Sequence, residues 1–175
     1  MKLFTKVPKE ELSLFAVKAL TVTAVLATAM LFFEARYRIG IDTQKHPCVD
    51  AHVFLWDMHD KHLEKGNLYV FETAVRQIRP PFSMKKQFWM KRLAAVGGDR
   101  VSIDEKGVLR INGEVTRTSL PLLRFNQGKS EDYAFDRILE KDELFFLGDT
   151  PDSYDSRYWG CVPRASVRGR GYIVF

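Results

Sequence analysis

Residues 148–160 read GDTPDSYDSRYWG, so that two glycines enclose a run of short polar side chains with a single arginine. This composition is typical of a structured loop in which side chains bond to the backbone. Within it, Asp155 and Arg157 can form a charge-assisted pair. Loops of this kind often carry function. A capped turn without function is the alternative interpretation of these residues taken alone.

A second segment, residues 90–101, reads MKRLAAVGGDRV and places Lys91 in an apolar strand that ends at two glycines. Burial of a lysine disfavours its charged form, and a neutral amine can act as a general base. Taken alone this pattern is weak, because a lysine in a strand usually lies at an edge or extends its stem toward water.

Short apolar runs of strand length recur along the chain. Residues 104–107 and 112–113 resemble hairpin turns. The runs lie at 53–56, 68–71, 87–96, 101–103, 108–111, 144–147 and 171–175. Many short strands with frequent turns predict a mainly β, largely antiparallel domain. Residues 133–141 are compatible with a short helix or with a strand.

An apolar run at residues 12–33 contains one charge, Lys18. As a helix it would reach about 33 Å, enough to span a hydrocarbon core of about 30 Å. A first segment with a short, basic N-terminus usually keeps that end in the cytoplasm. We therefore expect a cytoplasmic N-terminus at 1–11, a transmembrane signal anchor at 12–33 and an external domain at 34–175. A cleaved signal peptide is the alternative, because residues 27–29 have the small side chains of a cleavage site.

Composition restricts the classes of function. Hydrophobic residues make up 46% of the chain, which is sufficient for a buried core and argues against disorder. The net charge of +5 is modest, and no basic stripe with interleaved aromatic residues is present, so nucleic acid is not expected as a partner. No cofactor is expected.

Taken together, the two segments resemble the last two conserved boxes of the signal peptidase I superfamily, peptidase family S26. The first box is a K-R strand that closes on G-D, and the second is a G-D loop that closes on S-x-D-S-R-x-x-G. Residues 66–71, GNLYVF, are similar to the preceding box, with Asn67 in place of the usual aspartate. The resemblance implies a signal-peptidase-like antiparallel β catalytic domain behind a single N-terminal transmembrane helix.

The resemblance also implies roles for individual residues. Lys91 would be the general base, and Ser153, 62 residues later, would hydrogen-bond its amine and orient it. Asp155 and Arg157 would pair and brace the loop, and Arg92 would be structural. Members of the family use a Ser–Lys dyad and form an acyl-enzyme that water resolves. Their substrates are precursor proteins with small side chains at the −1 and −3 positions.

The family's nucleophilic serine has no counterpart here, since no serine lies between Arg36 and Trp56. When the family's motif is laid over residues 39–55, Cys48 takes its position, 43 residues before Lys91. A thiol ionises more readily than a hydroxyl, so Cys48 is the candidate nucleophile. An inert thiol, or a disulfide between Cys48 and Cys161, is the alternative.

Ser83 is a weaker candidate nucleophile. With Met84 it spells the family's S-M pair, but it lies only 8 residues before Lys91, in a segment broken by prolines.

One branch of the family is closest in pattern. Residues 40–44, which read GIDTQ, and residues 156–160, which read SRYWG, resemble TraF-type conjugative-transfer peptidases. That branch implies a pilin precursor as substrate and conjugative secretion components as further partners. It also implies a bacterial inner-membrane protein with a single pass, surrounded by inner-membrane lipid, and a periplasmic catalytic domain. General preprotein signal peptidases are the competing branch.

Three other functions match parts of the sequence. A catalytically inactive assembly factor of a conjugative pilus would keep the fold and lose the chemistry, and the departures at Cys48, Asp50, His52 and Asn67 favour it. Four histidines within residues 46–62 could bind a metal, although their spacing fits no standard site. A self-cleaving repressor would share the Ser–Lys chemistry but not the membrane run.

Overall fold

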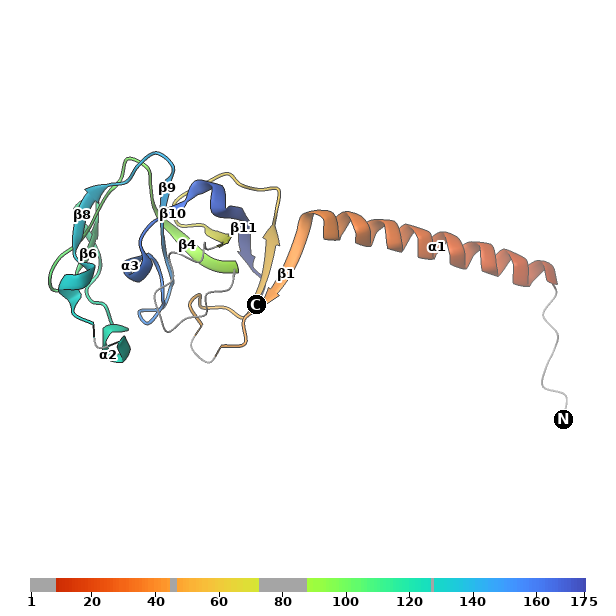
Figure 1. Ribbon diagram of the computed structural model, residues 1–175. Coiled ribbons are helices and arrows are strands. Elements are labelled where there is room, and N and C mark those ends of the chain that lie inside the picture. Colours follow the sequence, from red (N-terminus) through yellow and green to blue (C-terminus); the bar gives the residue numbers. More distant parts are fainter. Residues whose placement is uncertain (1–8, 45–46, 73–87, 127) are drawn as a thin grey trace. The chain divides into compact units, whose positions relative to one another are not determined.

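The computed structural model describes residues 9–44, 47–72, 88–126 and 128–175 (Figure 1). The chain divides into two compact units, Met1–Tyr37 and Arg38–Phe175. The first unit is built on one long helix and the second on two antiparallel sheets.

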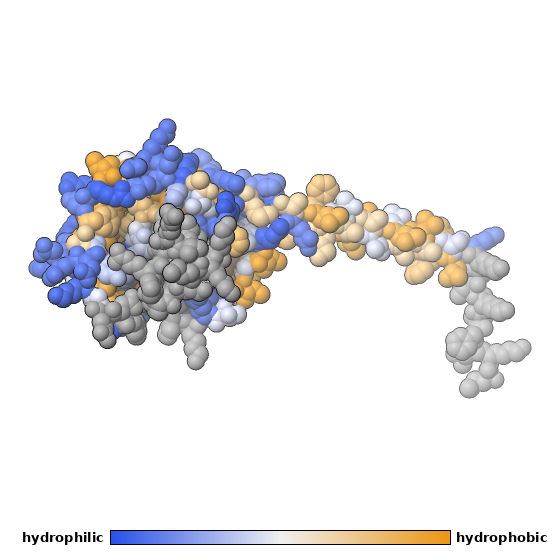
Figure 2. All heavy atoms as spheres, in the orientation of Figure 1, coloured by the Kyte–Doolittle hydropathy of each residue, from blue (hydrophilic) through white to orange (hydrophobic). Residues whose placement is uncertain are grey.

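Helix α1 (Lys9–Arg36) is apolar on all of its faces. The most apolar 18-residue window within Glu10–Arg36 has a mean hydropathy of 2.0, and none of this window is buried within the protein. Figure 2 shows mostly hydrophobic side chains along the helix. The hydroxyls of Thr21 and Thr28 bond to carbonyls one turn earlier, so their polar groups are satisfied inside the helix. A helix of this length that is hydrophobic all round is a candidate membrane span.

The helix is longer than the apolar run at residues 12–33 from which it was predicted. Its first turn contains Glu10 and Glu11, and its last turn contains Arg36. Acidic side chains at the start of a helix and basic side chains at its end interact favourably with the helix dipole. These charged residues therefore extend the helix beyond the apolar segment.

The second unit contains a seven-stranded sheet with the strand order β1-β2-β11-β3-β4-β9-β10. Its registered pairs are antiparallel. The strands are β1 (Tyr37–Ile41), β2 (Val53–Asp57), β3 (Leu68–Glu72), β4 (Phe88–Val96), β9 (Glu143–Leu147), β10 (Val162–Pro163) and β11 (Val167–Ile173).

A smaller antiparallel sheet has the order β7-β6-β5-β8. Its strands are β5 (Arg100–Ile103), β6 (Leu109–Ile111), β7 (Glu114–Arg117) and β8 (Phe135–Ile138). Asn112 and Gly113 join β6 to β7 with φ angles of 52° and 88°, the left-handed conformation that a tight hairpin turn requires. Figure 1 shows β6 and β8 at the opposite end of this unit from β11.

Short helical turns complete the second unit. The region that the sequence left undecided, residues 133–141, is split between the end of a 3-10 turn and strand β8. The turns are α2 (Leu123–Asn126), η2 (Ser130–Tyr133), α3 (Ser156–Trp159) and η3 (Arg164–Ser166).

The core places β4 and β9 in the interior. Phe145 and Phe146 are adjacent in β9, yet both are fully buried, in two different hydrophobic clusters. Both faces of β9 are therefore covered. Its neighbour β4 contributes Ala95 to one cluster and Leu93 to the other. A side chain in the middle of β4 is therefore buried away from bulk water.

The predicted mainly β fold is confirmed, but the last strand begins at Val167, four residues before the predicted start. Arg168, Gly169 and Arg170 resemble a polar loop in sequence. A Cβ at Gly169 would lie 2.2 Å from the carbonyl oxygen of Asp57, so the close approach of β2 requires glycine. The glycine that suggests a loop is therefore the residue that allows β11 to pair with β2.

Candidate active site

Lys91 lies in the middle of β4, paired with Tyr69 of β3, and only 1% of its surface is exposed. Its Nζ donates a hydrogen bond of 3.0 Å to Ser153 Oγ. The same nitrogen lies 5.5 Å from the centre of the Trp89 ring. In the described ranges no carboxylate forms an ion pair with Lys91.

Ser153 approaches β9 at Gly148, where there is no room for a side chain. A Cβ on Gly148 would lie 2.1 Å from Ser153 Oγ and 2.6 Å from the carbonyl oxygen of Cys48. Ser153 and the backbone of Cys48 therefore both pack against one glycine. This contact brings the Cys48 segment close to the Lys91–Ser153 hydrogen bond.

Several hydrogen bonds hold the Cys48 segment against the loop that follows β9. The Asp149 amide donates to the Cys48 carbonyl at 2.8 Å. The Thr150 hydroxyl donates to the Pro47 carbonyl at 3.0 Å. The Asp50 amide donates to the Asp149 carboxylate. Two segments about a hundred residues apart in sequence are thus fixed to each other.

A cleft of about 590 Å³ lies beside these residues, and both Cys48 and Lys91 line it. Much of its remaining wall is aromatic, with Trp56, Trp89 and Tyr154 among its members. The cleft therefore combines aromatic surface with one thiol, one amine and the carboxylates of Asp42 and Asp152.

Asp155 and Arg157 form a buried ion pair within the loop at residues 148–160. Arg157 Nε and Nη2 donate to the two carboxylate oxygens of Asp155 at 2.8 and 2.9 Å, and at most 1% of either side chain is exposed. Arg157 Nη2 also donates to the Ser153 carbonyl at 3.0 Å. Asp155 Oδ2 accepts from the Gly148 amide. The pair therefore holds both Ser153 and Gly148.

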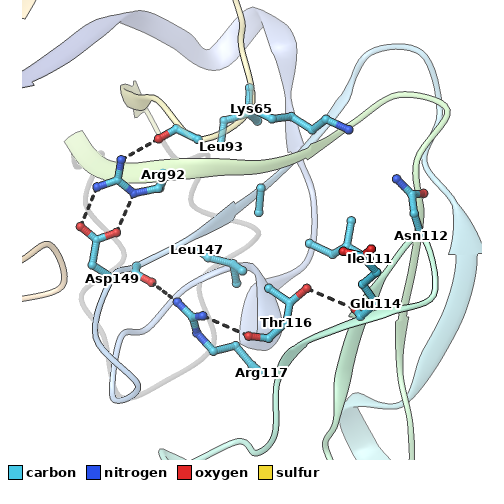
Figure 3. A pocket seen from close by; sticks show the side chains of 13 residues that line it. Lys65, Arg92, Leu93, Ile111, Asn112, Glu114, Thr116, Arg117, Leu147 and Asp149 are labelled. Carbon is cyan, nitrogen blue, oxygen red and sulfur yellow. Dashed lines mark hydrogen bonds and ion pairs between the residues drawn. The ribbon is translucent and has the colours of Figure 1, made fainter.

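Arg92, the residue after Lys91, points to a second cleft (Figure 3). Its Nε and Nη2 donate to the carboxylate of Asp149 at 2.7 and 2.8 Å, and Nη1 donates to the Gly66 carbonyl. Arg92 therefore pairs with Asp149, whose role was not predicted from the sequence. The only signal in the sequence was that Asp149 belongs to the G-D pair that opens the loop at residues 148–160.

The hydrogen bond from Arg92 lowers the pKa of Asp149, and the Asp50 amide and the charge of Arg117 act in the same direction. A lowered carboxyl pKa stabilises the fold above the unfolded value of about 4, and this stability is lost as pH falls through the folded value. We expect Asp149→Asn to be less stable than wild type by about 1 kcal/mol at pH 7, since the pair is part-exposed. The difference should shrink as pH falls through the lowered folded pKa of Asp149. Thermal unfolding between pH 3 and 8 measures it, and a difference independent of pH would contradict the linkage.

Both cysteines are free, so the structure contains no Cys48–Cys161 disulfide. Cys161 packs beside the core cluster, where Arg137 Nη2 donates to its sulfur at 3.3 Å. Burial raises the pKa of the Cys161 thiol to about 11. Cys161 is therefore a poor nucleophile, and among the described residues Cys48 is the thiol that lines the cleft.

Two other sequence hypotheses concern residues that fall partly outside the described ranges. Ser83 and His46 lie outside them. Within those ranges no group of three His, Cys, Asp or Glu side chains is arranged to hold a metal ion.

Comparisons with known proteins agree on one family. The family model for signal peptidase, peptidase S26, matches residues 12–175. A signal peptidase I from Leptolyngbya laminosa is 28% identical over 167 residues, which cover 91% of this chain and 77% of the relative. A probable signal peptidase I-2 from Synechocystis is 30% identical over 121 residues, which cover 64% of this chain and 48% of the relative.

A solved structure, of a signal peptidase I from Enterococcus faecalis, is 28% identical to this chain. It covers 63% of this chain and 97% of its own, with a TM-score of 0.40. The family model includes most of helix α1 as well as the β unit that holds Lys91 and Ser153. The chain therefore belongs to the signal peptidase family, peptidase S26.

Proposed function

We propose that this chain is a membrane-anchored endopeptidase that removes the leader from a secreted precursor, with Cys48 as nucleophile and Lys91 as general base. The observation that carries the proposal is the 3.0 Å hydrogen bond between the buried Lys91 amine and Ser153. It lies at a cleft that Cys48 also lines. Membership of the signal peptidase family supports the class of reaction.

Ser153 orients the amine of Lys91. The serine is 1% exposed, its carbonyl is held by Arg157, and its hydroxyl packs on Gly148. A side chain fixed in this way limits the positions that Lys91 Nζ can adopt. Such pre-organisation lowers the cost of bringing base and nucleophile together in the transition state.

The reaction follows the acyl-transfer scheme of nucleophilic catalysis. Cys48 Sγ attacks the scissile carbonyl carbon, and Lys91 Nζ takes the thiol proton. The C–N bond breaks, and Lys91 passes that proton to the leaving amine, which leaves a thioester on Cys48. Water attacks the thioester and gives one proton to Lys91. The C–S bond then breaks, and the thiolate of Cys48 recovers that proton.

The proposed substrate is a conjugative pilin precursor with small side chains at the −1 and −3 positions. The aromatic wall of the cleft, formed in part by Trp56, Trp89 and Tyr154, supports an apolar peptide segment beside Lys91. The TraF-like segments at residues 40–44 and 156–160 support a pilin over a general preprotein. Components of the conjugative secretion apparatus are proposed as further partners.

The proposed topology has a single span with a cytoplasmic N-terminus and a periplasmic catalytic domain in a bacterial inner membrane. The exposed apolar surface of α1 supports one span. Lysines at positions 2, 6 and 9 support the orientation, because basic residues before a first span favour the cytoplasmic side.

The nucleophile is tested by incubating the detergent-solubilised full chain with a pilin precursor and, in parallel, with a general preprotein. We expect wild type to cut the pilin precursor and Cys48→Ala to be slower by about a thousandfold, since truncation removes the attacking atom. Cys48→Ser retains a hydroxyl and is expected to cut slowly. Cys161→Ala is the matched control and should cut at the wild-type rate, with or without reductant.

Other outcomes would identify a different nucleophile, a different substrate or a protein without peptidase activity. Cleavage by Cys48→Ala at the wild-type rate would exclude Cys48, and Ser83 would become the candidate. A preference for the general preprotein would exclude the pilin assignment. Cleavage of neither substrate by folded wild type would favour the catalytically inactive assembly factor, for which the replacement of the family's serine by Cys48 is the supporting observation.

A further inference from the structure

Arg117 reaches the catalytic loop from the smaller sheet. It is the last residue of β7, whereas Lys91 and the strand before the loop belong to the larger sheet. Its Nη2 donates to the Gly148 carbonyl at 3.0 Å, and its Nη1 donates to the Thr116 carbonyl at 3.1 Å (Figure 3). In the part of the chain that the structure describes, no carboxylate forms an ion pair with this guanidinium.

The carbonyl that accepts from Arg117 belongs to the same peptide group as the Asp149 amide. That amide donates to the Cys48 carbonyl at 2.8 Å. Because a peptide group is planar and rigid, a hydrogen bond at its oxygen fixes the direction of its N–H. Bonds in such a chain also polarise one another. The peptide between Gly148 and Asp149 therefore connects Arg117 to the backbone of Cys48.

We propose that Arg117 is a positioning residue for the peptidase reaction, which holds Cys48 in place relative to Lys91 by anchoring the Gly148–Asp149 peptide. Arg117 contacts neither the cleft beside Cys48 nor the reacting atoms in this arrangement. It lies outside the sequence segments that resemble the family's boxes. The inference rests on the proposed function.

Neighbouring contacts support this role over a general contribution to folding. The Gly148 amide is separately held by Asp155, so the loop keeps one anchor when Arg117 is removed. The charge of Arg117 also acts on Asp149, where it helps to lower the carboxyl pKa. Loss of Arg117 is therefore expected to loosen one peptide group while the rest of the loop stays folded.

The second cleft allows a direct test of the hydrogen bond from Arg117 to the Gly148 carbonyl. It has a volume of about 540 Å³, and Arg117 lies in its wall with Ala94, Ile111 and Leu147. Truncation of Arg117 would enlarge this open space beside the Gly148 carbonyl. A free guanidinium ion could then enter and donate to the same oxygen.

The first experiment measures kcat and KM for precursor cleavage by full-length wild type, Arg117→Ala and Arg117→Lys. We expect Arg117→Ala to lower kcat by about tenfold to a hundredfold, the effect of losing one charge-assisted hydrogen bond. KM should change by less than about threefold. Millimolar guanidinium should restore part of kcat for Arg117→Ala only. Arg110→Ala, on the neighbouring strand and paired with Asp104, is the matched control and should not respond.

The second experiment does not depend on a substrate. All variants carry Cys161→Ala, so that iodoacetamide alkylates only Cys48. The rate of Cys48 alkylation should differ severalfold between Arg117→Ala and its parent. Added guanidinium should return this rate toward that of the parent. Failure of wild type to cut any precursor would reject the peptidase proposal, whereas alkylation would still test Arg117. An unchanged alkylation rate, or lost cleavage that guanidinium does not rescue and that follows a fall in Tm, would overturn the positioning role.

Discussion

Replacement of Lys91 by methionine is expected to reduce precursor cleavage by about a thousandfold or more, within the range that general acid–base catalysis contributes. The amine is the only basic group lining the cleft with Cys48 among the described residues. Methionine has a similar length and no proton to accept or return. Replacing a buried amine that has no described ion pair with an apolar side chain of similar volume should leave the fold stable. Cleavage rates and thermal unfolding of the same preparations measure both effects.

Two further variants refine this prediction. Ser153→Ala keeps the amine and removes its 3.0 Å partner, so a smaller loss of about tenfold to a hundredfold is expected. Lys106→Met changes an exposed lysine in the turn between β5 and β6 and should leave cleavage unchanged. If Lys91→Met kept more than about a tenth of the wild-type rate, Lys91 would not be the general base.

Replacement of Arg157 by methionine is expected to have the largest effect on stability, about 3–5 kcal/mol, because it leaves the buried carboxylate of Asp155 without its partner. At most 1% of either side chain is exposed. The variant also removes the donors to the Ser153 and Pro151 carbonyls. Small domains have a free energy of unfolding of about 5–15 kcal/mol. A loss of this size is therefore a large part of the total stability. Urea unfolding of the full chain in detergent measures the loss.

A double variant separates the cost of the unpaired Asp155 carboxylate from the cost of the lost hydrogen bonds to the backbone. Asp155→Asn combined with Arg157→Met removes both charges, so it should be less destabilised than Arg157→Met alone if the unpaired carboxylate is the main cost. Arg100→Met, whose exposed partner is Asp136, is the matched control and should leave stability nearly unchanged, because solvent screens an exposed ion pair. Equal destabilisation by the single and double variants would show that the hydrogen bonds to the backbone dominate.

The sequence predicted the β fold and the family because both depend on local patterns. Apolar runs between turn residues marked most strands, and the segments around Lys91 and Arg157 identified the family. The helix was placed correctly from its apolar residues, although its charged ends were underestimated. Strand β11 was partly missed because Gly169 accommodates the backbone of Asp57, a contact that a single segment cannot reveal.

The remaining features of the site depend on contacts between distant segments. Asp149 bonds to Cys48 about a hundred residues earlier, and Arg117 reaches Gly148 from another sheet. Neither residue type is unusual in its own segment. The sequence named Cys48, Lys91 and Ser153 as candidates, while their catalytic roles remain proposals for the cleavage and alkylation experiments.

The position of β11 has a consequence for how the nascent chain matures. Strands β2 and β3 follow each other in sequence but do not pair, because β11 lies between them. Val167–Ile173 is synthesised about a hundred residues after β3, so the two earlier strands lack their shared partner while those residues are being made. Pairing across so long a separation is slow and leaves strand edges exposed. The connection of β2 to β3 is thereby delayed until β11 has emerged from the ribosome, whereas β3, β4, β9 and β10 can pair without it.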